Sequence, residues 1–142
     1  MDIDEVRQIQ KNRETDSVYV TFQERSGALE VLPTIVSDEY LMGLLERSAS
    51  YQKKIAFEAD ENKKISKIYL AEEDEISQIE ENETGYCITH KGSEGLFQLS
   101  NTNSQQQVFL SKLQQAQAQG KSFAYVTDAF LEYLAVKVIE KE

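Results

Sequence analysis

The sequence predicts an α+β protein: a tandem pseudo-repeat of ββαββ units, mostly antiparallel sheet with two amphipathic helices, plus a short N-terminal helix. Three observations lead to this prediction. Many short segments alternate apolar and polar residues, as half-buried strands do. Two longer segments carry apolar residues at helical spacing. The order strand, strand, helix, strand, strand then occurs twice along the chain.

The N-terminal helix is predicted from Ile3, Val6 and Ile9, which recur every three residues before Asn12. Polar residues fill the positions between them, as on an amphipathic helix. After this segment the spacing changes to alternation, which is typical of strands. Alternation predicts strands over 18–22, 28–32, 53–59, 65–71, 85–90, 96–100 and 121–127.

Two helices are predicted between the strands. The first covers 38–51, with Ser37 as its N-cap and carboxylates in its first turn. The second begins at Ser104, which forms a capping box with Gln107. Gly120 ends this second helix, because glycine adopts the left-handed conformation common at a helix C-terminus.

The internal repeat is the most distinctive feature of the sequence. One offset pairs Tyr19 with Tyr86, and one inserted residue later Lys53 pairs with Lys121. The same register favours a strand for the tail, 128–142, which by spacing alone fits either a strand or a helix. The alternative is chance, because any two α+β segments with ordinary alternation can be slid into partial register.

We predict a single domain, 1–142, with similar halves at 17–71 and 85–140. A half of roughly 55 residues buries too little surface to be comfortably stable alone, whereas two halves that share a core can be stable. The halves are joined by an acidic connector, 72–84.

The connector is the most extreme local composition in the chain. Residues 72–83 include seven acids and no base. Ile76 and Ile79 interrupt the acidic run at helical spacing, which predicts a solvated helical connector held by two apolar contacts.

Composition excludes several classes of function. The chain has 25 acidic and 15 basic residues, a net charge of −10, which opposes direct binding to nucleic acid or to an anionic membrane. One Cys and one His cannot supply a disulfide or the usual structural zinc site. The N-terminus lacks the features of a secretory signal and no apolar run approaches ~20 residues, so we expect a cytoplasmic protein.

Catalytic chemistry is not predicted. Cys87 and His90 stand three apart on a predicted strand and therefore point to opposite faces, so we expect a half-buried Cys and a solvent-side His. Asp60 and Asp128 occupy matching repeat positions and are the best candidates for paired carboxylates, although Asp is common in turns. We predict no enzyme, with no catalytic residues, no metal ligands and no cofactor.

The leading functional prediction is a small acidic protein-interaction or assembly module of the adaptor, chaperone or inhibitor type. Its partner is expected to be another protein with a basic surface, and a homodimer is compatible with this prediction. The alternative is a small-ligand binding domain that uses the cleft between the two repeats. The candidate docking surface consists of Glu72, Glu73, Asp74, Glu75, Glu80, Glu81 and Glu83.

Overall fold

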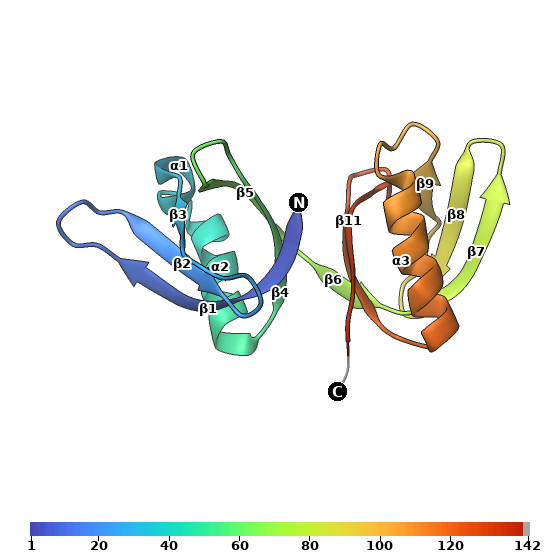
Figure 1. Cartoon of the computed structure of the whole chain (residues 1–142), viewed down its shortest axis with the longest axis horizontal. Helices are drawn as coiled ribbons and strands as arrows, with labels where there is room; N and C mark the ends of the chain where they lie inside the picture. The colour runs from blue at the N-terminus through green and yellow to red at the C-terminus, as the bar shows by residue number, and fades with distance from the viewer. Residues whose placement is uncertain (141–142) are drawn as a thin grey trace. The chain divides into compact units, whose positions relative to one another are not determined.

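The computed structural model describes residues 1–140, and the α+β class is confirmed. The chain forms two compact units, one covering Met1–Ala71 and a second that starts at Glu72 (Figure 1). None of the helices among the described residues is long and apolar enough to cross a membrane.

Strands dominate both units. The first unit contains β1 (Asp2–Lys11), β2 (Val18–Phe22), β3 (Leu29–Val31), α1 (Pro33–Val36), α2 (Glu39–Tyr51), β4 (Lys54–Ala59) and β5 (Lys64–Leu70). The second contains β6 (Glu72–Asp74), β7 (Ile76–Asn82), β8 (Gly85–His90), β9 (Phe97–Ser100), α3 (Gln106–Gln119), β10 (Phe123–Thr127) and β11 (Tyr133–Val138). The strand predicted for the tail is confirmed over the range of β11.

The first unit is a closed barrel with the strand order β1-β2-β3-β5-β4. Only β3 and β5 pair in parallel, and the other neighbours are antiparallel. The barrel closes because β1 is long enough to pair with β4 through its first residues and with β2 through the rest. With its helices between β3 and β4, this connectivity is that of the OB-fold, a five-stranded Greek-key barrel.

The second unit consists of two three-stranded sheets, β11-β10-β6 and β7-β8-β9. A parallel bridge between Gln98 and Glu132 joins β9 to the residue before β11. Ser100 N–H, two positions further along β9, donates to the Glu132 carboxylate at 3.0 Å. In the first unit the backbone itself joins β3 to β5, since Leu32 N–H donates to the Ile65 carbonyl.

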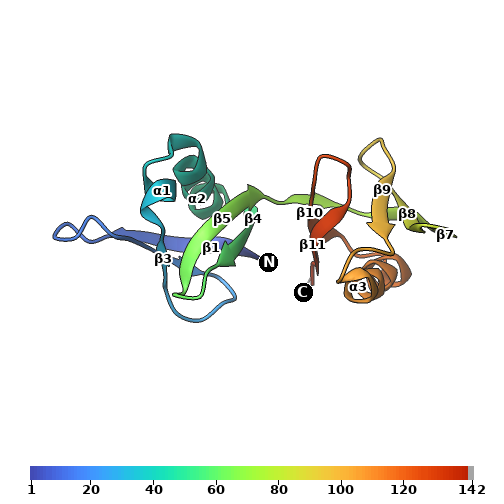
Figure 2. The same cartoon turned by 90° about the horizontal axis from the view of Figure 1, so that it is seen from above.

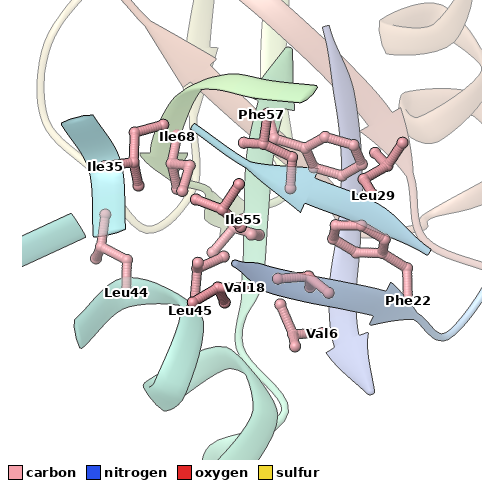
Figure 3. Packing of buried hydrophobic residues seen from close by; sticks show 13 residues of the cluster. Val6, Val18, Phe22, Leu29, Ile35, Leu44, Leu45, Ile55, Phe57 and Ile68 are labelled. Atoms are coloured by element: carbon pink, nitrogen blue, oxygen red, sulfur yellow. The ribbon is translucent and has the colours of Figure 1, made fainter. Parts of the chain in front are cut away.

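Each unit has its own hydrophobic core. In the first, Ile35 of α1 and Leu44 and Leu45 of α2 point toward Ile55 and Ile68 of the barrel (Figure 3). At the other end of this core the rings of Phe22 and Phe57 stack with centroids 4.3 Å apart. The core of the second unit is built from β7–β11 and α3, including Ile88, Leu99, Leu113, Phe123 and Tyr133.

The predicted N-terminal helix is wrong: its residues form β1. The predicted helical connector is also wrong, because residues 72–82 form β6 and β7. Both errors have the same physical cause. A β-bulge lies between Val6 and Gln8 in β1 and another between Ile76 and Gln78 in β7. A bulge adds one residue, so inward positions that are normally two apart become three apart and imitate a helix.

Two predicted helix starts are also corrected. Asp38, not Ser37, is the N-cap of α2, because its carboxylate accepts from the amides of Tyr40 and Leu41. α3 begins at Gln106 without a side-chain cap, so the capping box predicted at Ser104 does not form. Gly120 ends α3 in the left-handed conformation, as predicted.

The bend of β1 depends on Asp4, which is only 4% exposed. Its carboxylate accepts from the amides of Glu5 at 2.7 Å, Glu24 at 3.2 Å and Arg25 at 2.9 Å. These bonds occur where β1 changes partner from β4 to β2. The carboxylate therefore satisfies amides at the bend and fixes the β2–β3 loop to it.

We expect Asp4→Ala to destabilise the first unit by roughly 2–4 kcal/mol, because it removes charge-assisted bonds from buried amides. Urea unfolding combined with amide exchange of first-unit residues would measure this loss. Asp2→Ala is the matched control, since Asp2 meets Arg25 at 2.9 Å in an exposed ion pair of small expected value. Equal losses for the two variants would contradict the role assigned to Asp4.

Candidate functional site: the acidic strands of the second unit

The seven acids predicted as a docking surface do not form one continuous patch. Glu72, Glu73 and Asp74 belong to β6, which pairs with β10. Glu80 and Glu81 lie near the end of β7, and Glu83 lies in the turn that follows. The structure therefore divides the predicted surface into a β6 group, which Glu75 follows, and a group at the tip of the β7–β8 hairpin.

Asp74 is not available for docking through a free carboxylate. Its side chain is 8% exposed, its Oδ1 accepts from the amides of Glu75 and Gly92, both at 2.8 Å, and its Oδ2 accepts from the Ser93 hydroxyl at 2.9 Å. Burial acts to raise the pKa of Asp74, but these three bonds and nearby His90 outweigh it, so the pKa lies below its ordinary value. Asp74 holds the β8–β9 loop.

The hairpin tip carries three exposed acids, Glu80, Glu81 and Glu83, and Glu72 and Glu73 of β6 are exposed as well. Glu80 stands opposite Cys87 and Glu81 opposite Tyr86 in the antiparallel ladder, so these neighbouring carboxylates project from opposite faces of the hairpin. We call Glu80, Glu81 and Glu83 the acidic tip.

The corresponding first hairpin of the other unit has a different charge. Residues 6–22 contain the bases Arg7, Lys11 and Arg13 and two acids, whereas residues 76–90 contain the acidic tip and no base. Both hairpins are formed by the first long strand of a unit and its antiparallel neighbour (Figure 2). The two hairpins therefore carry opposite net charge.

The two residues considered for thiol chemistry point to opposite faces, but the prediction of a solvent-side histidine is wrong. Cys87 is half-buried, as predicted, whereas His90 is 4% exposed and packs in the core of the second unit. The signal for this was present in the sequence, since His90 lies two residues after the buried Ile88 on the same strand.

The two candidate carboxylates Asp60 and Asp128 are turn residues. Asp60 Oδ1 accepts from the amides of Asn62 and Lys64, at 2.9 and 3.0 Å. Asp128 Oδ1 accepts in the same way from Phe130 and Glu132, at 2.8 and 3.1 Å. Both carboxylates therefore have a local structural role.

Within residues 1–140 no group of three or more His, Cys, Asp and Glu side chains is placed to hold a metal ion. A hollow of about 360 Å³ opens in the first unit between α2 and the β1–β2 hairpin. Val18, Val36 and Met42 form its apolar lining, and Lys11, Glu39 and Glu46 are its charged residues.

Comparison with known proteins gives no relative: no family model, no curated protein and no solved structure matches this chain.

We expect Asp74→Asn to loosen the β8–β9 loop. The amide is uncharged and has one oxygen, so it cannot replace the two carboxylate oxygens that accept the three hydrogen bonds. Exchange of the Gly92 amide should accelerate at least about tenfold, which corresponds to 1.4 kcal/mol. Glu94→Gln removes one carboxylate charge from the β8–β9 loop itself and serves as control. Unchanged exchange at Gly92 in Asp74→Asn would contradict the role of this carboxylate.

Proposed function

We propose that the chain is a protein-interaction module whose acidic tip binds a basic segment of another protein. The single observation that carries the proposal is the charge contrast between the two hairpins: three exposed acids without a base in the second unit, three bases with two acids in the first. Because the first hairpin forms the same structure without this acidity, the fold does not require it.

Long-range electrostatics support a role for the acidic tip in association. The carboxylates of the acidic tip are exposed, so their field extends into solvent and accelerates encounters with a basic partner. Among residues 76–90 there is no Lys or Arg to neutralise them. Such steering weakens as salt increases, because exposed charges are screened over about 8–10 Å.

Nucleic acid is a poorer candidate partner, even though OB-folds often bind oligonucleotides on the face of their second and third strands. In the first unit the outward residues of that face are Tyr19, Thr21 and Glu30, and in the second unit Cys87 and Gln98 take such positions. One aromatic ring and an acid do not form the basic, aromatic surface on which bases stack.

We further propose that the chain is a tandem duplication. Its repeating unit begins with β1 in the first unit and with β6 and β7 in the second. Matching hydrogen bonds support this proposal: Asp4 and Asp74 both accept from the next amide and from the following loop. Asp60 and Asp128 close matching turns, and a bulge follows Glu58 and Val126 at corresponding ladder positions.

The ladder registers favour a slightly different alignment from the one based on sequence. In the first unit Val18 pairs with Lys11 of β1 and with Val31 of β3. In the second unit Tyr86 pairs with Glu81 of β7 and with Leu99 of β9. Val18 therefore corresponds to Tyr86, so the pairing of Tyr19 with Tyr86 is shifted by one residue. In the corrected register no inserted residue is needed between the second strand and the helix of the unit.

The proposal is tested with the triple variant Glu80→Gln/Glu81→Gln/Glu83→Gln and a fluorescent decalysine peptide as the basic probe. We expect the Kd at low salt to rise about tenfold, since each exposed charge pair contributes roughly 0.2–1 kcal/mol. The control, Glu39→Gln/Glu46→Gln/Glu61→Gln, makes the same change in net charge in the first unit and should raise Kd less than about twofold. Equal effects would show that net charge, rather than the acidic tip, attracts the probe.

A second candidate function, binding of a small ligand, is favoured by the hollow beside α2. Its volume of about 360 Å³ lies within the range of small-molecule sites. In a thermal-shift screen of metabolites, a ligand of this hollow should raise the Tm of the protein by mass action, and Gly43→Leu should abolish the shift by filling the hollow. A shift that persists in Gly43→Leu would place the ligand elsewhere, and no shift from a broad set would count against this function.

A further inference from the structure

His90 occupies a position that belongs to a phenylalanine in the first unit. In the ladders, Val6 faces Phe22 and Ile76 faces His90, so the two residues take the same place at the end of the second strand of each unit. Phe22 stacks on Phe57 in an apolar core. The second unit therefore buries the ionisable ring of His90 at a position where the first unit has the apolar ring of Phe22.

Aromatic side chains enclose the imidazole. Its ring is stacked on Phe97 with centroids 3.7 Å apart, and the rings of Phe123 and Tyr125 lie edge-on at 5.0 and 4.7 Å. The side chain is 0% exposed. Burial lowers the pKa of His90 to about 4, although the Asp74 carboxylate acts in the opposite direction.

The two ring nitrogens have different surroundings. Nε2 lies 2.5 Å from the Tyr133 hydroxyl, whereas Nδ1 is buried without a hydrogen bond, 3.7 Å from Asp74 Oδ2. We assign the tautomer in which Tyr133 donates to Nε2 and Nδ1 carries the hydrogen. The opposite tautomer would direct a lone pair at the carboxylate, which is repulsive.

Asp74 connects this nitrogen to the β8–β9 loop. The carboxylate that faces Nδ1 is the one that holds the Gly92 amide and the Ser93 hydroxyl. Gly92 approaches so closely that a Cβ at this position would lie 2.8 Å from Asp74 Oδ1. His90, Asp74 and the loop residues 91–96 are therefore one packed assembly.

We propose that His90 is a proton-operated lock on this loop: neutral His90 keeps the β8–β9 loop closed on Asp74, and protonation of the buried Nδ1 favours a state in which the loop opens and water reaches both groups. When the loop is closed, a protonated His90 has no contact with solvent, and the nearby Asp74 carboxylate already accepts three hydrogen bonds. An open loop hydrates the cation and frees that carboxylate to pair with it.

The remaining groups around His90 do not supply a competing charge. From β10 and β11 it is faced by the hydroxyls of Tyr125 and Tyr133, whose pKa values are raised mainly by burial, so both stay neutral. Glu72 of β6 acts on Tyr125, and the Cys87 thiol of β8 acts on Tyr133. Among the described residues, Asp74 is the charged group whose field raises the pKa of His90.

The direction of the pH effect follows from proton linkage. A histidine held below its ordinary pKa of 6.5 binds a proton more tightly when the loop is open, so closure is favoured fully above pH 6.5 and less as pH falls toward about 4. A difference of 2.5 pKa units between closed and open states corresponds to an increase of up to roughly 300-fold in the open population.

The full chain can be tested directly by NMR, because His90 is its single histidine and gives one imidazole Cε1–H signal. Between pH 7 and pH 5 we expect the exchange of the Gly92 amide, which donates to Asp74, to increase at least about tenfold after correction for its intrinsic pH dependence. The amides of Glu24 and Arg25, which Asp4 holds in the first unit, should keep their protection.

The His90→Phe variant should abolish the pH response of the Gly92 amide while leaving the second unit folded, since Phe22 shows that the position accepts this ring. If an unpaired Tyr133 hydroxyl destabilises it, His90→Phe/Tyr133→Phe removes both polar groups. An unchanged pH response in the folded variant would overturn the proposal. Titration of His90 at its ordinary pKa with the loop protected throughout, or simultaneous opening of both units, would also overturn it.

Discussion

A buried carboxylate at a strand bend is the constraint on which each unit depends. One long strand must leave its first neighbour and join another, and the peptide groups at the turning point lose their ladder partners. Asp4 and Asp74 accept hydrogen bonds from those amides and from the loop beyond the next strand. Because a buried amide without a partner is costly, the bend and the loop are stabilised together by one side chain.

The contact between β3 and β5 in the first unit, and that between β9 and the residue before β11 in the second, differ by the exchange of a single charged side chain. Lys64 pairs with Glu30 at 3.1 Å across the closed seam of the first unit, and the second unit has Glu132 beside Gln98 at this place. The Glu132 carboxylate then caps Ser100 and also accepts from Asn103 at 2.9 Å. In the second unit the Glu132 side chain therefore accepts from Ser100, whereas in the first unit Leu32 donates to a backbone carbonyl. Pairing between β9 and the residues before β11 is correspondingly shorter than pairing between β3 and β5.

Strands with regular alternation, such as β2, β3 and β9, could be predicted from the sequence because their burial follows the two-residue period. The strands β1 and β7 could not, since the extra residue of a bulge gives pairs such as Val6 and Ile9 the spacing of a helix. Partners distant in the chain, such as β3 with β5, leave no trace in local periodicity. The acidity of the candidate site was evident from composition, but the burial of Asp74 depends on contacts with Gly92 and Ser93, 18 and 19 residues away.

Within residues 1–140 every ladder pairs strands of the same unit, and this has a mechanical consequence. Under tension applied at the two termini, the units carry the load in series, so extension should occur in two separate steps. Each step releases a chain of about 70 residues, or roughly 230–250 Å of contour length. The second unit, in which the Glu132 side chain supplies part of the contact between β9 and β11, is the one expected to yield first.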